Sequence, residues 1–238
     1  MSANEQYANH IRFNSSEYEK HRIELMQRVK DTLAQNAINC VLGITGDGDD
    51  ALMGKAETVI GEFMDEIKGK GYAILTGGTE GGIPQLGVEL AKENNIPRIG
   101  VFPKQGRKYA LMDDLDLAIE ATLPDIGDGN FGTETPSFVN LLDGATVIGG
   151  SYGTLVEATT MLKVNTKRIK DKEQSKDDIR DPIFLAPILG TGGAADHLYE
   201  VAKVFQRGAE QCLPAENESL LTGVDAAKFL RRKLEVNI

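Results

Sequence analysis

The stretch YAILTGGTEGGIPQLGVELAKENNIPRIGVFP, residues Tyr72–Pro103, decides the fold of this chain. A short apolar run ends at a glycine-rich turn, an amphipathic run follows to Asn94, and a second apolar run covers Ile99–Phe102. This order predicts a strand, a turn, a helix and a second strand. Glycines allow a sharp turn and let an anion approach the amides at the start of a helix. The turn therefore indicates either a phosphate site or only a tight strand-to-helix connection.

The same alternation of apolar and amphipathic runs continues along the chain. Further strands are predicted at 40–45, 115–121, 145–148 and 183–188, and helices at about 16–35, 56–67, 135–141, 155–165, 198–205 and 224–236. We therefore predict one Rossmann-like α/β domain over residues 1–238, with a doubly wound, mainly parallel sheet flanked by helices. Residues 1–36 are expected to form an N-terminal arm and helix. The charged segment 166–181 is expected to be a surface linker or flap.

Two more glycine turns follow predicted strands, at Gly149–Thr154 and at Gly190–Gly193. Parallel strands end at one edge of their sheet, so all three turns are expected to line one crevice. We expect Gly78→Val to abolish nucleotide binding and to leave the fold largely intact. The predicted nucleotide-binding residues at the strand ends are Gly46, Thr76, Gly77, Gly78, Thr79, Glu80, Gly81, Gly82, Thr135, Gly149, Gly150, Ser151, Tyr152, Gly153, Thr154, Gly190, Thr191, Gly192 and Gly193.

A compact basic cluster lies between two of the predicted strands, at Lys104–Lys108. Arg107 or Lys108 could contact a ligand phosphate through charge-assisted hydrogen bonds. The alternative is a solvated turn without contact to ligand. Both residues are included among the predicted nucleotide-binding residues.

Composition narrows the classes of function. The chain has 238 residues, a net charge of −10 and a pI of about 4.9, which disfavour nucleic acid and anionic membranes as partners. It shows no signal peptide and no apolar run near 18 residues, so we expect a cytoplasmic protein that does not span a membrane. Cys40 and Cys212 have no metal-ligand spacing and are expected to be reduced thiols.

An aspartate-rich loop follows the first predicted strand, with Asp47, Asp49 and Asp50. An EF-hand would need glycine at its sixth position and glutamate at its twelfth, and the chain has Leu52 and Thr58 there. The three histidines are scattered. We therefore predict no metal site and no cofactor.

The two longer glycine motifs resemble those of the LOG superfamily of Rossmann-like nucleotide-binding proteins, formerly called lysine decarboxylase-like. The family's first motif is GGGxxGLMG, and Gly77, Gly78 and Gly82 match it. Its second is PGGxGTxxE, which is matched by Gly150, Gly153, Thr154 and Glu157. The resemblance covers about residues 40–205. The phrases GGTEGGIP, GTETPSF and PILGTGG are most similar to the prokaryotic relatives of the TRPM sensor domain.

The resemblance implies a catalytic role for Glu157 only if the chain is an enzyme. LOG phosphoribohydrolases pair this glutamate with an arginine, whose position falls here near Glu134-Thr135, and no arginine occurs between Pro124 and Gly150. Glu157 could stabilise positive charge on a ribose or orient water. Alternatively, it only interacts with the helix dipole.

Two classes of function follow as hypotheses. The first is a binding or sensing module for a nucleotide or an ADP-ribose-like metabolite. The second is a LOG-type phosphoribohydrolase that cleaves the N-glycosidic bond of a nucleoside monophosphate, and another chemistry on the same fold stays open. The resemblance also implies a homodimer or higher homo-oligomer. Apolar residues on more than one side of the helix after Gly153 favour the same assembly (Leu155, Val156, Met161, Leu162 and Val164).

Overall fold

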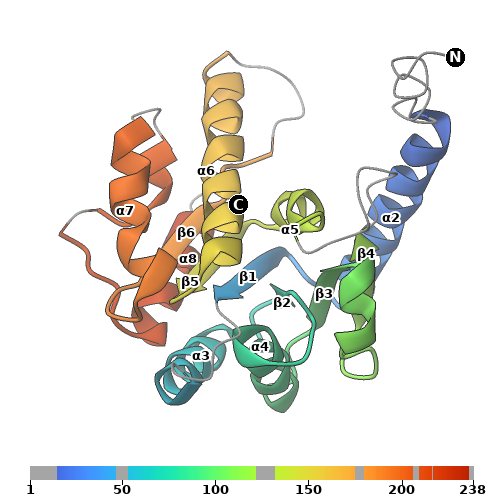
Figure 1. Cartoon of the computed structure of the whole chain (residues 1–238), viewed down its shortest axis with the longest axis horizontal. Coiled ribbons are helices and arrows are strands. Elements are labelled where there is room, and N and C mark those ends of the chain that lie inside the picture. The colour runs from blue at the N-terminus through green and yellow to red at the C-terminus, as the bar shows by residue number, and fades with distance from the viewer. Residues whose placement is uncertain are drawn as a thin grey trace, which may run out of the picture.

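The chain folds into a single α/β unit around one six-stranded, all-parallel sheet with helices on both faces, which confirms the predicted fold class (Figure 1). The computed structural model describes residues 15–46, 53–121, 132–174, 180–205, 209–215 and 217–235. Residues 1–14 of the predicted N-terminal arm and the aspartates after Gly46 lie outside these ranges. None of the described helices is both long and apolar enough to cross a membrane.

The helices and strands follow the predicted alternation closely. The strands are β1 (Cys40–Gly46), β2 (Tyr72–Thr76), β3 (Arg98–Pro103), β4 (Leu117–Ala121), β5 (Gly144–Ile148) and β6 (Phe184–Ile188). The helices are α2 (Ser15–Gln35), α3 (Met53–Ile67), α4 (Gly82–Glu93), α5 (Thr135–Leu141), α6 (Tyr152–Glu173), α7 (Gly193–Phe205) and α8 (Gly223–Glu235). Two short 3₁₀ segments complete the set, η2 (Lys104–Tyr109) and η3 (Ala209–Cys212).

The order of the strands creates one point where the direction of winding reverses. The sheet runs β4-β3-β2-β1-β5-β6, so the chain winds outward from β1 to β4 and then returns to β5 on the other side of β1. Gly46 at the end of β1 pairs in register with Ile148 at the end of β5. Ligands of open parallel sheets bind outside the carboxyl ends of the strands at such a reversal. The fold therefore indicates the ends of β1 and its neighbours as the place to look for a site.

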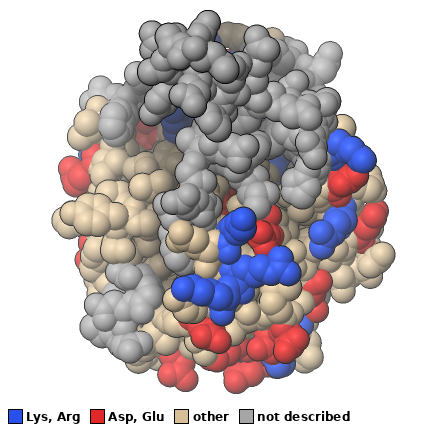
Figure 2. Space-filling model, turned by 45° about the vertical axis from the view of Figure 1, so that its right-hand side comes forward, with Lys and Arg blue, Asp and Glu red and all other residues tan. Residues whose placement is uncertain are grey.

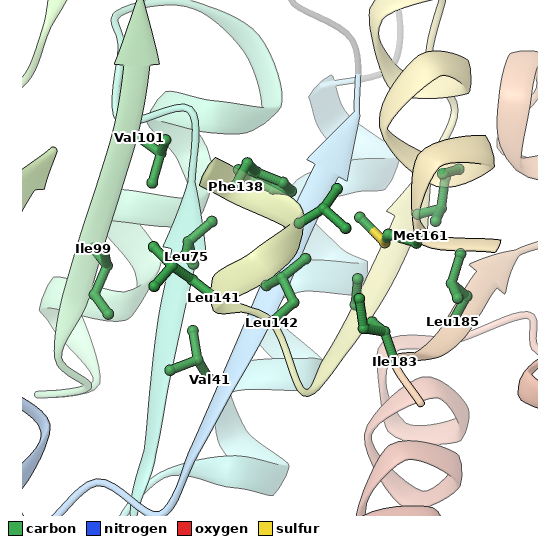
Figure 3. Packing of buried hydrophobic residues seen from close by; sticks show 14 of the residues in the cluster. Val41, Leu75, Ile99, Val101, Phe138, Leu141, Leu142, Met161, Ile183 and Leu185 are labelled. Carbon is green, nitrogen blue, oxygen red and sulfur yellow. The ribbon is translucent and has the colours of Figure 1, made fainter. Parts of the chain in front are cut away.

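Two apolar layers hold the sheet between its helices. One face packs against α2, α5, α6 and α7, and Figure 3 shows Leu75, Phe138, Met161 and Leu185 interdigitating there. The opposite face packs against α3, α4 and α8. Cys40 and Cys212 are buried and form no disulfide. The strands are buried on both faces, as parallel strands between two helical layers must be.

The predicted linker at 166–181 begins as helix, because α6 continues to Glu173. Asn165 fixes this part of α6 through both of its amide atoms: Nδ2 donates to the Ile183 carbonyl and Oδ1 accepts from the Ile183 amide, each at 2.7 Å. The buried Arg168 donates from Nη1 to the Asp181 carbonyl at 2.8 Å. The charge pattern suggested a solvated linker, but these inward-facing residues extend the helix. Residues 175–179 of the predicted flap lie outside the described ranges.

Candidate ligand-binding cleft

A cavity of about 280 Å³ opens at the carboxyl ends of β1, β2 and β3, beside the reversal of the sheet. Residues from both sides of β1 contribute to it, because α6 follows β5 and the first glycine turn follows β2. The described residues that line it are Ile44, Thr45, Gly46, Gly77, Thr79, Glu80, Gly81, Pro84, Val101, Phe102, Pro103, Tyr109, Glu134, Phe138 and Glu157.

Glu157 extends into this cavity from the second turn of α6. The hydroxyl of the buried Thr45, on β1, donates a hydrogen bond to Oε2 of Glu157. Burial raises the pKa of Glu157 to about 7, and repulsion from Glu134 contributes in the same direction, although the Thr45 hydrogen bond lowers the pKa. Near neutral pH, Glu157 can therefore exchange a proton as well as accept hydrogen bonds.

Glu134 places a second carboxyl group in the same cavity, directly before α5. Its Oε2 accepts a hydrogen bond from the Gly132 amide at 2.7 Å, and burial raises its pKa. Sequence reasoning did not select Glu134 as a site residue, although it placed the missing arginine of the LOG motif near this position. It also missed the cavity walls formed by Thr45, Phe102 and Phe138.

Three of the six amides in the first glycine turn, Gly77–Gly82, donate hydrogen bonds to other groups of the protein. The Gly78 amide donates to Thr76 Oγ1 at 2.9 Å, the Glu80 amide to the Tyr109 carbonyl at 2.7 Å, and the Gly81 amide to Gln85 Oε1 at 2.7 Å. Gly77 and Thr79 line the cavity, and their amides have no hydrogen-bond partner within the described part of the chain. Only part of this turn can therefore offer amides to an anion.

Gly78 is needed by the fold itself. A Cβ at this position would lie 2.6 Å from Gly100 Cα, and the φ of +60° is one that side chains other than glycine rarely adopt. The expectation that Gly78→Val leaves the fold intact is therefore wrong. Gly77 is the better position for a test, because an added Cβ would make ordinary contacts at 3.7 Å with Pro84.

The second glycine turn leaves the start of α6 open. No hydrogen-bond partner exists among the described residues for the amides of Ser151, Tyr152, Gly153 and Thr154, and no side chain caps the helix. The first three of these residues are exposed. The start of a 22-residue helix with free amides is a favourable place for an anion.

The third glycine turn is occupied by the protein's own groups. Asp196, in the first turn of α7, accepts hydrogen bonds from the Gly190 amide at 2.7 Å and the Gly192 amide at 3.1 Å. The Ala194 and Ala195 amides donate to the carbonyls of Gly150 and Gly149, each at 2.9 Å. The third turn therefore supports the second one from behind. Of the three glycine turns, only the first lines the cavity; the described residues of the second and third do not.

The other predicted residues lie around the cleft. Arg107 Nη1 pairs with Glu120 Oε2 at 2.9 Å, and Lys108 Nζ lies 4.6 Å from the centre of the Tyr109 ring. Thr135 is buried at the start of α5. Figure 2, which turns the right-hand side of Figure 1 forward, shows a group of adjoining Lys and Arg side chains near the centre of that face, with acidic side chains above and below it. No group of three His, Cys, Asp or Glu side chains in the described ranges could hold a metal ion.

Fold and cleft together define a Rossmann-like α/β protein with a candidate ligand site at the winding reversal of its sheet. Similar solved structures share this fold. TM1055, a structural-genomics target, is 16% identical with a TM-score of 0.60, and the match covers 82% of this chain and 99% of that one. The molybdenum cofactor carrier protein of Chlamydomonas reinhardtii is 19% identical with a TM-score of 0.54, over 83% of this chain and 99% of that one.

A third similar structure is the molybdenum cofactor binding protein of the phototrophic bacterium Rippkaea orientalis. It is 18% identical with a TM-score of 0.56, and the match covers 82% of this chain and 98% of that one. No family model and no curated protein sequence matches the chain. At these identities the similarity establishes the fold, and function has to be inferred from the cleft.

Proposed function

We propose that this chain binds a nucleotide or an ADP-ribose-like metabolite in the cleft. One observation carries the proposal: Glu157 of α6 lines the cavity, and the same helix presents unpartnered amides at its start, one and a half turns earlier and outside the cavity lining. The amides and the helix dipole suit a phosphate, and the carboxylate suits the hydroxyl groups of a ribose. At the rise of an α-helix, five residues separate the two features by roughly 7 Å along the axis, comparable with the length of a sugar phosphate.

Apolar residues in the lining of the cavity support a place for the base. Phe102 and Phe138 are buried and contribute apolar surface to the cleft, and Pro84 adds to it. The two phenylalanines are only 2% and 1% exposed, so a planar heterocycle would meet a small apolar surface there rather than an open ring face. The cavity of about 280 Å³ is at the lower end of the size of ligand pockets, so it suits a nucleoside portion, with the phosphate closer to solvent.

The test is direct binding of ADP-ribose and AMP, measured by isothermal titration calorimetry on the full chain and on Gly77→Ala. The added methyl group would lie beside Pro84 and Thr79, which line the cavity, at ordinary contact distances, so we expect affinity to fall about tenfold or more with the fold unchanged. Gly61→Ala, in α3 where an added Cβ meets nothing within 4 Å, is the matched control. Absence of binding to the unmodified chain, or equal affinity in Gly77→Ala, would count against the proposal.

A second candidate is hydrolysis of an N-glycosidic bond in the same cleft. The observation that favours it is the pair of carboxyl groups, Glu134 and Glu157, which line one cavity and both have a raised pKa. One ionised carboxylate can stabilise positive charge on the ribose, and the other can orient water. The C1′–N bond breaks, the water oxygen joins C1′, and the proton goes to the leaving base.

Turnover separates the two candidates. Release of free base from a nucleotide panel, followed by chromatography, should depend on Glu157 and be lost in Glu157→Gln if the chain is a hydrolase. Binding without any release of base supports the binding module. The cavity offers no arginine among its described lining residues to hold a phosphate during such a reaction, which is why binding is our first choice.

The homodimer stays a prediction, and the structure reduces one of its supports. Of the α6 residues that suggested it, Met161 and Leu162 are buried in the core, and Val156 is exposed. Tyr152, which is 88% exposed, adds a second large side chain to the outer surface of α6. Light scattering at micromolar protein concentration gives the mass, and a monomer would contradict the prediction.

A further inference from the structure

A second cavity lies next to the cleft and shares one residue with it. This lysine cavity has a volume of about 490 Å³, and the described residues that line it all belong to η2: Lys104, Gln105, Lys108 and Tyr109. Tyr109 also lines the cleft, and so does Pro103, which directly precedes Lys104. The two cavities therefore meet at Tyr109, and a ligand that extends from the cleft past this residue enters the lysine cavity.

Backbone hydrogen bonds hold the end of η2 against the first glycine turn. The Glu80 amide donates to the Tyr109 carbonyl at 2.7 Å, and the Leu111 amide donates to the Gly78 carbonyl at 2.9 Å. An antiparallel bridge joins the residues that lie between these two contacts. The backbone that carries the two lysines is therefore fixed relative to the cleft by the same turn that lines it.

The lysine cavity holds two ammonium groups that no carboxylate neutralises. In the part of the chain that the structure describes, neither Lys104 nor Lys108 forms an ion pair, whereas Arg107 between them pairs with Glu120 Oε2 at 2.9 Å. Lys108 Nζ lies 4.6 Å from the centre of the Tyr109 ring, beside the residue that the two cavities share. Two such ammonium groups in one cavity favour an anion, and a phosphate group can accept hydrogen bonds from both.

The lysine cavity lies on the opposite side of the cleft from the amides before α6. These amides follow β5, and η2 follows β3. The two strands are three positions apart in the sheet, which is roughly 14 Å at the spacing of neighbouring strands. The described lining of the cleft between them includes no lysine or arginine. One phosphate group cannot contact both places, so a ligand that uses both needs two phosphate groups with a sugar between them.

We infer that the cleft and the lysine cavity together select nucleotides with two separated phosphate groups, one at the amides before α6 and the other at Lys104 and Lys108. This inference rests on the proposed function, because it assigns the phosphate pattern of the ligand in the same cleft. The ribose between the two phosphate groups lies within the cleft, where Glu157 is available to its hydroxyl groups. Lys104 and Lys108 are then specificity-determining residues for the second phosphate.

ADP-ribose and ADP-ribose 2′-phosphate form the pair of probes. They differ only in one phosphate group, which a ribose separates from the diphosphate. Calorimetry on the full chain at pH 7.5 and low ionic strength should show about fivefold or more tighter binding of the 2′-phosphate. In the double variant Lys104→Gln/Lys108→Gln, the ratio of the two affinities should fall to within twofold of one, while the affinity for ADP-ribose itself stays within twofold of the unmodified value.

The matched control is the double variant Lys68→Gln/Lys70→Gln, which changes the net charge by the same amount. Both lysines are exposed between α3 and β2, at the amino edge of the sheet and therefore on the side away from the cleft. This variant should keep the ratio of the unmodified chain. A fall in the ratio that is equal in both double variants would show that net charge, and not contact with the lysine cavity, causes the preference.

Salt supplies a second, independent readout. Ion pairs at exposed ammonium groups are screened as the Debye length shortens. Raising the salt concentration from about 0.05 M to about 0.5 M should therefore bring the ratio of the unmodified chain towards one, and it should leave the ratio of Lys104→Gln/Lys108→Gln where it is. A preference that does not change with salt would contradict ion pairing in the lysine cavity.

The outcomes separate this inference from the proposed function. Equal affinities for ADP-ribose and its 2′-phosphate would overturn the second phosphate position and leave the nucleotide site standing. A preference that survives in Lys104→Gln/Lys108→Gln would overturn the role given to the two lysines. If neither compound binds, the proposed function fails and the inference fails with it.

Discussion

The glycine turn before α6 and the glycine turn before α7 both follow a parallel strand, both begin a helix, and lie against each other. Their amides nevertheless have different partners. Before α7, the Gly190 and Gly192 amides bind the Asp196 carboxylate, and the next two helix amides bind the carbonyls of Gly149 and Gly150. Before α6, the amides from Ser151 to Thr154 have no partner among the described residues.

The difference shows that a glycine-rich turn identifies a ligand site only when its amides remain available. Asp196 occupies at α7 the place that an external anion would take, so that turn is complete without ligand. The turn before α6 has no such residue, and the only acidic side chain nearby on that helix, Glu157, faces the cavity instead. The amides of the turn before α7 stabilise the fold, and those of the turn before α6 remain available to a ligand.

Disrupting the contact between these two turns should lower the stability of the fold more than any other change considered below. In Gly193→Ala the added Cβ would collide with the carbonyl oxygen of Gly150, which is backbone and cannot move aside cheaply. Overpacking of this kind costs about 1–3 kcal/mol, and the left-handed φ of +53° adds about 1 kcal/mol. We expect a loss of about 3 kcal/mol in the free energy of unfolding, measured with urea.

Gly192→Ala separates the two causes of that loss. It has a φ of +81°, and an added Cβ meets nothing within 4 Å, so only the backbone strain applies. A loss of about 1 kcal/mol is expected there. Equal losses in both variants would show that the collision with Gly150 is relieved by movement of the turns.

The second largest effect on stability concerns Glu157, the carboxyl group on α6 after the second glycine turn. Glu157 has a pKa of about 7 in the folded chain and an ordinary value of 4.5, so the folded state binds its proton more tightly than the unfolded state does. Folding stability therefore falls as the pH rises from about 4.5 through 7. Glu157→Gln removes this loss and should raise the free energy of unfolding by about 2 kcal/mol at pH 8, with little change at pH 4.

Urea unfolding at the two pH values measures this difference. Glu89→Gln, with an exposed side chain on α4, should leave the curves parallel to those of the unmodified chain. A stabilisation by Glu157→Gln that is the same at both pH values would mean that packing, and not the buried charge, is responsible.

The third effect on stability concerns the third glycine turn, Gly190–Gly193. Asp196→Ala leaves the amides of Gly190 and Gly192 without their carboxylate, which should cost about 1 kcal/mol of stability. Because the third turn does not line the cavity, the affinity for ADP-ribose should stay within twofold of the unmodified value. A loss of tenfold or more with the fold retained would place the third turn in the binding site after all.

The fold could be predicted from local pattern, because apolar runs and glycine turns alternate with amphipathic segments from Cys40 onward. The extension of α6 could not, since it depends on Asn165 and Arg168 meeting the backbone before β6, a contact that spacing alone does not reveal. Within the cleft, sequence reasoning found Glu157 through the motif that resembles the LOG family. It missed Glu134, which reaches the cavity only through the placement of α5.

A change at Gly153, in the glycine turn before α6, should have the smallest effect on stability. Its effect on ligand binding should nevertheless be large. An added Cβ at this position meets nothing within 4 Å, and alanine is the better helix former, so Gly153→Ala should gain a few tenths of a kcal/mol. If a phosphate lies against the amides of Ser151–Thr154, however, the methyl group narrows the approach of the anion to the backbone. Affinity for ADP-ribose should then fall about tenfold, while Gly61→Ala, the same change in a helix remote from the cleft, leaves it unaltered. Loss of affinity together with a gain in stability is an outcome that damage to the fold cannot produce. Unchanged affinity in the stabilised variant would show that the amides before α6, although open, are not where the ligand binds.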